Sequence, residues 1–144
     1  MKESAIRSFS LLLALAATPA GTALAQHDQA IEDKDVKVVQ FEDLKYPQLA
    51  RTAHIEGAVV LRLKLDRNGN VLDVAVLSGN PILAHTSAQS AKDWRFEPND
   101  QNAVILVYNF RLEGLCPRHI ESSQLLFYPP NFVAVSSCLA TVQP

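Results

Sequence analysis

Two adjoining stretches of the chain alternate apolar and polar residues with the two-residue period of a β-strand. In the run GAVVLRLKLD, which starts at Gly57, one face carries Val59, Leu61, Leu63 and Leu65. After RNGN the alternation resumes with Leu72, Val74 and Val76. The dipeptide Asn68-Gly69 between the two runs favours a tight hairpin turn. Residues 57–78 therefore predict an antiparallel hairpin with one apolar face.

The spacing of apolar residues changes after this hairpin to three and four, which is typical of a helix. The residues with this spacing are Leu83, Ala84, Ala88, Ala91 and Trp94. The pattern predicts a helix over 81–95, which Pro98 stops. Trp94, the single tryptophan, then lies on the buried side of the last turn. We expect it to be a core residue; the alternative is an exposed platform on which a ligand stacks.

Three further segments complete the predicted fold. The run VKVVQF at 36–41 predicts a short strand, and YPQLARTAHIEG predicts a short helix with Pro47 at its start and Gly57 as its terminator. The run AVILVYNFRLEG from Ala103 predicts a long strand, with the face that carries Leu106, Tyr108 and Phe110 turned toward the helices. The order strand, helix, hairpin, helix, strand predicts an α+β two-layer sandwich, a small antiparallel sheet with two helices on one face.

Residues 1–25 have the features of a secretory signal peptide. Two basic residues precede the apolar run FSLLLALAA, and the small residues ALA stand directly before Gln26. We expect cleavage before Gln26, followed by a flexible arm over 26–35. The alternative is an uncleaved membrane anchor, but Pro19 and Gly21 interrupt a stretch that barely reaches the roughly 20 residues of a spanning helix.

Charge and cysteine content restrict the partners of the exported chain. Loss of Lys2, Arg7 and Glu3 with the leader leaves 11 of 13 basic and 14 of 15 acidic residues, a net charge near −3. This balance argues against nucleic acid or an anionic membrane surface as a partner. In an oxidising compartment the two cysteines, Cys116 and Cys138, predict one structural disulfide.

No residue pattern in the sequence predicts an enzyme, a metal site or a cofactor. The histidines His27, His54, His85 and His119 have no metal-ligand spacing. No serine lies in a nucleophile elbow, and no glycine-rich loop is present that could hold a phosphate. We therefore expect no catalytic residues, no metal, no cofactor and no small-molecule substrate.

A series of short motifs, in order and spacing, is similar to a known family. The motifs are Tyr46-Pro47 with Ala50-Arg51, Glu56-Gly57, Asn68-Gly69, Ser78-Gly79, and Trp94-Arg95-Phe96 with Pro98. From about residue 36 to residue 112 the sequence resembles the C-terminal domain of TonB-type energy transducers. The resemblance implies two helices on a small antiparallel sheet, a periplasmic location and a binding role in transport across the outer membrane.

The resemblance also implies a binding site. Domains of that family bind the TonB box, a short segment of an outer-membrane transporter, as an extra strand along the exposed edge of the last strand. Carried over to this sequence, the domain spans 36–114 and the edge is 103–112. The implied partner-binding residues are Ala103, Ile105, Val107, Asn109 and Arg111. The implied partner is an outer-membrane TonB-dependent transporter or another envelope protein.

The sequence departs from the family pattern before the domain. Family members that transmit force have a membrane anchor and a long proline-rich linker, whereas here about ten residues separate a cleavable leader from the domain. A true transducer, anchored in the inner membrane, therefore requires that the leader is not cleaved. A second alternative is a structural envelope protein that oligomerises, as a homodimer for example, by pairing of edge strands.

The second departure is a C-terminal extension, residues 115–144, which is too apolar for a disordered tail. Residues 125–128 and 132–136 predict two short strands around Pro129-Pro130. In one hypothesis the extension packs back on the domain, held by the Cys116–Cys138 disulfide, and covers the docking edge. In the other it forms a hairpin on an unrelated edge of the sheet.

Overall fold

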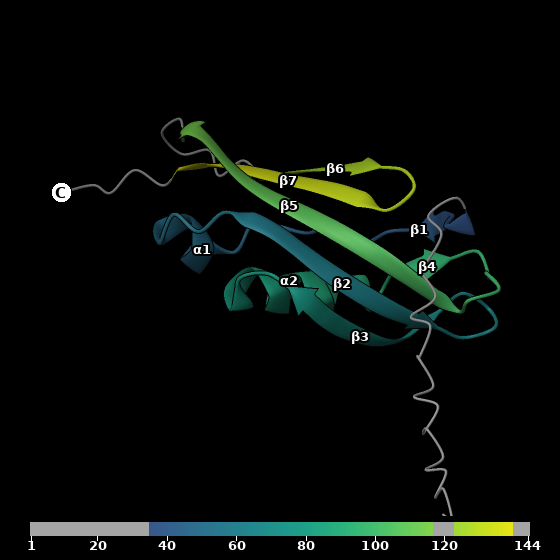
Figure 1. Ribbon diagram of the computed structural model, residues 1–144. Coiled ribbons are helices and arrows are strands. Elements are labelled where there is room, and N and C mark those ends of the chain that lie inside the picture. The colour runs from purple at the N-terminus through teal and green to yellow at the C-terminus, as the bar shows by residue number, and fades with distance from the viewer. Residues whose placement is uncertain (1–34, 117–122, 140–144) are drawn as a thin grey trace, which may run out of the picture.

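The computed structural model describes residues 35–116 and 123–139 (Figure 1). The predicted signal peptide and nearly all of the predicted arm lie outside the described residues. The elements in chain order are β1 (Val38–Gln40), α1 (Gln48–Thr52), β2 (Gly57–Leu65), β3 (Val71–Ser78), α2 (Pro81–Ala91), β4 (Arg95–Phe96), β5 (Ala103–Leu115), β6 (Ser123–Tyr128) and β7 (Phe132–Leu139).

The main sheet has five strands in the order β3-β2-β5-β7-β6. Strand β2 pairs antiparallel with β3 and β5, whereas β7 pairs parallel with β5 and antiparallel with β6. This sheet is mixed, so the prediction of a purely antiparallel sheet is wrong. The reason is the C-terminal extension, which reverses direction twice after β5 and returns beside it in the same direction. Its two strands are observed, and both are longer than predicted.

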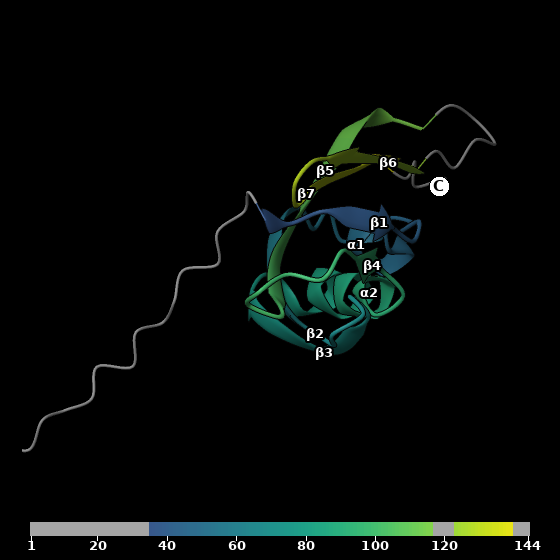
Figure 2. The same ribbon diagram turned by 90° about the vertical axis from the view of Figure 1, so that its right-hand side faces the viewer.

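The helices lie on one side of the curved sheet (Figure 2). Strands β2 and β3 curve around α2, while β6 and β7 lie above β1 and α1. The short strands β1 and β4 pair antiparallel and form a separate two-stranded ribbon on the same side. The opposite face of the main sheet carries no helix among the described residues.

The β2–β3 hairpin is observed where the alternation predicts it. The turn is longer than two residues, because the Asp66 N–H donates to the Asn70 carbonyl at 2.9 Å. A register shift between Lys64 and Leu65 places Val71 opposite Leu65. Leu72 was expected on the apolar face but is 61% exposed, since the bulge shifts the alternation by one residue.

Helix α2 begins as predicted and ends earlier. The Asn80 side chain accepts a hydrogen bond from the Ile82 N–H at 2.9 Å, and Pro81 is the first helical residue. The helix ends at Ala91 rather than Arg95, because Arg95–Phe96 is extended and the Phe96 N–H donates to the Gly69 carbonyl. The expected burial of Trp94 is nevertheless confirmed, as its side chain is 1% exposed.

Helix α1 is also shorter than predicted, and it does not end at Gly57. It ends at Thr52, and His54 follows with a left-handed φ of 54°. The Ile55 N–H donates to the Ala50 carbonyl at 2.8 Å and closes the last turn. Gly57 instead begins β2.

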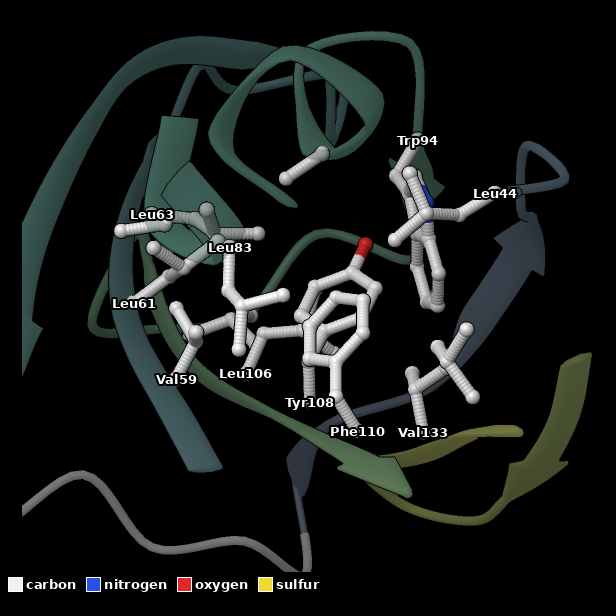
Figure 3. Close-up of a cluster of buried hydrophobic side chains, with 14 of the residues drawn as sticks. Leu44, Val59, Leu61, Leu63, Leu83, Trp94, Leu106, Tyr108, Phe110 and Val133 are labelled. Carbon is white, nitrogen blue, oxygen red and sulfur yellow. The ribbon is translucent and has the colours of Figure 1, made fainter. Parts of the chain in front are cut away.

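The hydrophobic core lies between the sheet and the helices (Figure 3). The predicted inner face of β5 is confirmed, with Leu106, Tyr108 and Phe110 fully buried. The C-terminal extension contributes to the same core, because Val133 and Val135 of β7 are also 0% exposed. Burial of each such valine stabilises the fold by about 1.5–3 kcal/mol. The extension is therefore part of the core of this domain.

Candidate functional site

The candidate site is the edge of β5 that faces away from β2. The β2 ladder covers the other edge of β5, from Gly57 opposite Phe110 to Lys64 opposite Ala103. The backbone groups of the odd-numbered residues of β5 point away from β2, and on that side the Val107 N–H donates to the Asn131 carbonyl at 2.9 Å. The partner-binding residues that the family resemblance implies are all odd-numbered, so their backbone groups point to this side. Their side chains lie on the helix-free face of the sheet and are half-buried, apart from the exposed Arg111.

Two asparagine side chains occupy the first part of this edge. Asn99 accepts a hydrogen bond from the Ala103 N–H at 3.2 Å and donates one to the Ala103 carbonyl at 2.9 Å. Asn131 donates through Nδ2 to the Ile105 carbonyl at 3.0 Å. Both side chains therefore take the place that the backbone of a neighbouring strand would have.

Strand β7 occupies the rest of the edge. Its parallel register runs from Phe132 opposite Val107 to Leu139 opposite Leu115. The register includes two further predicted partner-binding residues, since Asn109 lies opposite Ala134 and Arg111 opposite Ser136. An added strand from another protein can pair along this part of β5 only after β7 has moved away.

Strand β7 is held at both of its ends. At its start, Asn131 bonds to Ile105 and Val107 of β5. At its end, the predicted disulfide between Cys116 and Cys138 is present, with a Cα–Cα distance of 4.9 Å. The Cys116 N–H also donates to the Leu139 carbonyl at 3.1 Å.

Strand β6 covers the aromatic part of the core. Phe127 lies 5.8 Å from the rings of both Trp94 and Phe41, measured between centroids. The Tyr46 N–H donates to the Ser123 hydroxyl at 2.8 Å, so the start of β6 is joined to the segment before α1. The hairpin of β6 and β7 therefore contacts both the edge of β5 and the segments beneath it.

Sequence reasoning missed three polar residues that complete the hydrogen bonds of β5. Asn99 and Asn131 bond to its outer side, and the Glu56 carboxylate accepts from the Leu112 N–H beyond the end of β2. The sequence offers one signal for Asn99, a polar residue shortly before a strand. For Asn131 no local signal exists, because its role depends on a residue 26 positions away.

Two tyrosines whose pKa values are raised lie in the core beneath the site. Burial raises the pKa of Tyr108 to about 12. Burial, together with the charge of Glu56, raises the pKa of Tyr46 to about 12, and the Tyr46 hydroxyl donates to the Ile55 carbonyl at 2.6 Å. Both phenols are neutral at physiological pH. Residues 35–116 and 123–139 contain no cluster of His, Cys, Asp or Glu that could hold a metal ion.

The site therefore offers backbone hydrogen bonds along a strand and apolar positions beneath it. Such groups bind an extended peptide. Across the described part of the chain, no helix has the length and apolar character that crossing a membrane requires.

Comparison with known proteins identifies the part of the chain that carries this edge. Residues 42–112 match the family described as the Gram-negative bacterial TonB protein C-terminal. This domain belongs to the TonB C-terminal family. The family match ends within β5, so β7, which covers the edge, and β6, which pairs with β7, lie outside the TonB C-terminal part.

Curated relatives of this TonB C-terminal domain are much longer than the matched segment. Protein TonB of Vibrio cholerae is 31% identical over 90 residues, which are 57% of this chain and 37% of the relative. Protein TonB of Pseudomonas aeruginosa is 30% identical over 79 residues, which are 54% of this chain and 23% of the relative. The chain thus spans less than two fifths of the length of either relative.

A solved structure also matches the TonB C-terminal domain. It is the solution NMR structure of the Pseudomonas aeruginosa TonB CTD, which is 26% identical. The match covers 58% of this chain and 92% of that chain, with a TM-score of 0.44.

Proposed function

We propose that this chain is a periplasmic interaction domain that binds an extended segment of an outer-membrane transporter, or of another envelope protein, as an added strand. The observation that carries the proposal is the pairing of β7 with β5. The chain's own extension adds to this edge as a strand, and the edge belongs to the part of the chain that is of the TonB C-terminal family. The edge of β5 is thus suited in shape and hydrogen bonding to strand addition.

The bound partner strand takes the place of β7. It pairs with the outward backbone groups of Val107, Asn109 and Arg111, and it extends toward Ile105 and Ala103 when Asn131 and Asn99 release them. Because Val133 and Val135 are fully buried, the partner strand must carry aliphatic residues at the two corresponding positions. A strand with charges at these positions would leave them buried and unpaired.

One covalent bond and one hydrogen bond oppose the exchange of β7 for the partner strand and set its rate. The Cys116–Cys138 disulfide holds the end of β7, and the Asn131 side chain holds its start. With the disulfide intact, β7 remains at a high local concentration beside β5 and competes with the partner. Reduction of the disulfide therefore increases the affinity for the partner strand.

Trp94 fluorescence tests the exchange. The indole is buried beneath Phe127 and Phe41, so displacement of the β6–β7 hairpin exposes it and shifts its emission to longer wavelength. The probes are a synthetic TonB-box peptide and a peptide of sequence NFVAVSSSL, which copies residues 131–139 with serine in place of Cys138. We expect both to bind, and the reduced protein to bind more tightly than the oxidised protein.

Hydrogen exchange supplies the site-specific measurement. In the free oxidised protein the amides of Val107, Asn109 and Arg111 are protected by β7. With peptide present they stay protected while the amides of β7 exchange faster. A peptide that binds without any change in β7 would contradict exchange at β5, and the absence of binding to either redox form would contradict the proposed function.

The anchored-transducer alternative depends on the leader, which lies outside the described residues, and it stays a prediction. Mass spectrometry of the N-terminus of the membrane-extracted and soluble protein decides it. A mature chain that begins at Gln26 has no anchor.

A further inference from the structure

The main sheet has two outer strands, β3 and β6, and they differ in how they are protected from pairing. Strand β3 has a register shift near each end and carries Asp73. Bulges and charges of this kind protect an edge against another strand. Strand β6 has the sequence SQLLFY, which contains no charge and no proline. Its register with β7 is continuous from Ser123 to Tyr128, so β6 is the unprotected edge.

The register shows which backbone groups of β6 face outward. The carbonyls of Asn131 and Leu139 point at β5, so the even-numbered residues of β7 pair with β6. These even-numbered residues lie opposite Gln124, Leu126 and Tyr128. The N–H and C=O groups of Ser123, Leu125 and Phe127 therefore face away from β7, and no strand of the described chain pairs with them.

We propose that β6 pairs antiparallel with β6 of a second copy of this chain, about a two-fold axis at Leu125. In this register Leu125 lies opposite its own copy, and Ser123 lies opposite Phe127. All three outward-facing residues of each strand then find backbone partners, which no other two-fold register achieves within 123–128. The two main sheets become one continuous sheet, and the interface is the same patch on both copies.

The charge pattern of β6 favours a second copy as its occupant. In a two-fold strand pair both strands carry the same side chains, so charges of one sign on β6 would lie near the same charges of the second copy. Like charges that lie opposite each other are destabilising. The absence of Asp, Glu, Lys and Arg from 123–128 removes this conflict over the full length of the strand.

Apolar side chains on both sides of the edge complete the interface. On the helix-free face, Leu126 is 54% exposed and Tyr128 is 51% exposed. On the other face Phe41, which is 46% exposed, packs against Phe127. A second copy of β6 with its own Leu126 and Phe127 covers these residues, and their burial adds to the backbone pairing.

The self-association state of the oxidised mature chain tests the proposal. We expect a dimer in sedimentation equilibrium whose dissociation constant rises about tenfold or more in Leu126→Lys, since lysine on an edge strand opposes pairing. The matched control is Leu72→Lys on β3, where the exposed leucine lies at the protected edge; it should leave the dimer unchanged. A second variant, Gln124→Lys, repeats the test should Leu126→Lys fail to fold.

A wild-type chain that stays monomeric at millimolar concentration would overturn the proposal, as would equal effects of Leu126→Lys and Leu72→Lys. Hydrogen exchange gives an independent readout. The amides of Leu125 and Phe127 should become protected as protein concentration rises, while those of Leu126 and Tyr128 are protected throughout. If a TonB-box peptide protects the amides of Leu125 and Phe127 and a higher protein concentration does not, β6 binds a strand of another protein. That result would overturn the proposed dimer.

This inference does not rest on the proposed function, although a peptide that displaces the β6–β7 hairpin also moves the dimer edge. The β7 strand separates β6 from the candidate edge of β5, so a dimer leaves that edge as it is. Leu126→Lys should therefore weaken the dimer and still show the peptide-driven shift of Trp94 emission. Loss of only one of the two responses shows which proposal has failed.

Discussion

Phe127 of β6 packs edge-on against the indole of Trp94, with the ring centroids 5.8 Å apart and the ring planes at 78°. Trp94 belongs to the TonB C-terminal part, and Phe127 belongs to the extension that follows it. The contact joins two segments that differ in family membership within one aromatic cluster. Stability of the whole domain should therefore depend on residues beyond the family match.

Replacing Phe127 with alanine tests this dependence. We expect a loss of about 3 kcal/mol in the free energy of unfolding, because removal of the phenyl ring leaves a cavity beside Trp94. Urea unfolding of the oxidised protein measures the loss. Leu72→Ala is the control, since its side chain is exposed and lies on β3, away from the hairpin, and its loss should change stability by no more than about 0.5 kcal/mol. Equal losses in the two variants would show that the hairpin does not support the core.

Removal of the disulfide should weaken the attachment of β7. Cys116→Ala combined with Cys138→Ala lowers the free energy of unfolding by roughly 3 kcal/mol in the chain-entropy description of cross-links, because the bridge joins residues separated by 22 positions. Reductant should destabilise the wild type by a similar amount and leave the double variant unaffected. A double variant as stable as the oxidised wild type would contradict this role.

The Asn131 side chain should hold the start of β7. Asn131→Ala removes the bond to the Ile105 carbonyl and should lower the free energy of unfolding by about 1 kcal/mol. Asn131→Asp should lower the free energy of unfolding further at neutral pH, since a carboxylate then faces the Ile105 carbonyl. Protonation below about pH 4 should recover part of the loss. Urea unfolding at both pH values checks the order, and an aspartate variant as stable as the wild type at neutral pH would exclude this contact.

Gly69 should not tolerate a side chain. Its φ is +82°, and a Cβ there would overlap the Phe96 carbonyl of β4. We expect Gly69→Ala to lower the free energy of unfolding by more than about 3 kcal/mol, because the β4 backbone must shift and alanine is also strained at this φ. Gly114→Ala is the matched control, with a φ of +65° and open space around it; it should cost about 1–2 kcal/mol from strain alone. Thermal and urea unfolding distinguish the two.

Alkaline pH should destabilise the domain through Tyr108. Burial raises its pKa from 10.0 to about 12 in the folded state, so the folded chain holds the phenolic proton more tightly than the unfolded chain. This contribution, on the order of 2–3 kcal/mol, is present in full below pH 10 and is lost as the pH rises toward 12. The free energy of unfolding, measured from pH 8 to 12, should fall more steeply for the wild type than for Tyr108→Phe. Parallel curves for the two proteins would contradict the role of Tyr108.

The alternation of residues in β2 and β5 was sufficient to predict both strands and their buried faces. Leu61, Leu63 and Tyr108 are all fully buried, because strict alternation leaves a strand one choice of inner face. Alternation failed at Leu72, where a bulge shifts the register. The helical periodicity also predicted α2 to be longer than it is, because the hydrogen bond of Phe96 to Gly69 holds Arg95 and Phe96 in a strand.

The neighbour of β5 could not be predicted in the same way. Alternation indicates which face of a strand is buried and says nothing about which strand lies beside it. The parallel pairing of β7 depends on contacts that no local pattern contains, such as Asn131 with Ile105 and Val133 with the core. The sequence therefore predicted two strands in the extension and left open the edge to which they add.

The parallel pairing of β5 and β7 also bears on biosynthesis. A ribosome and a translocation channel both release a chain from its N-terminus, so β5 emerges before β7, and domains begin to fold as they emerge. The emerging chain therefore passes through a stage in which β2, β3 and β5 exist and the outer side of β5 has no strand beside it. During that interval the chain is open to capture, by a chaperone or by a second unfinished chain, at an edge that the finished molecule covers.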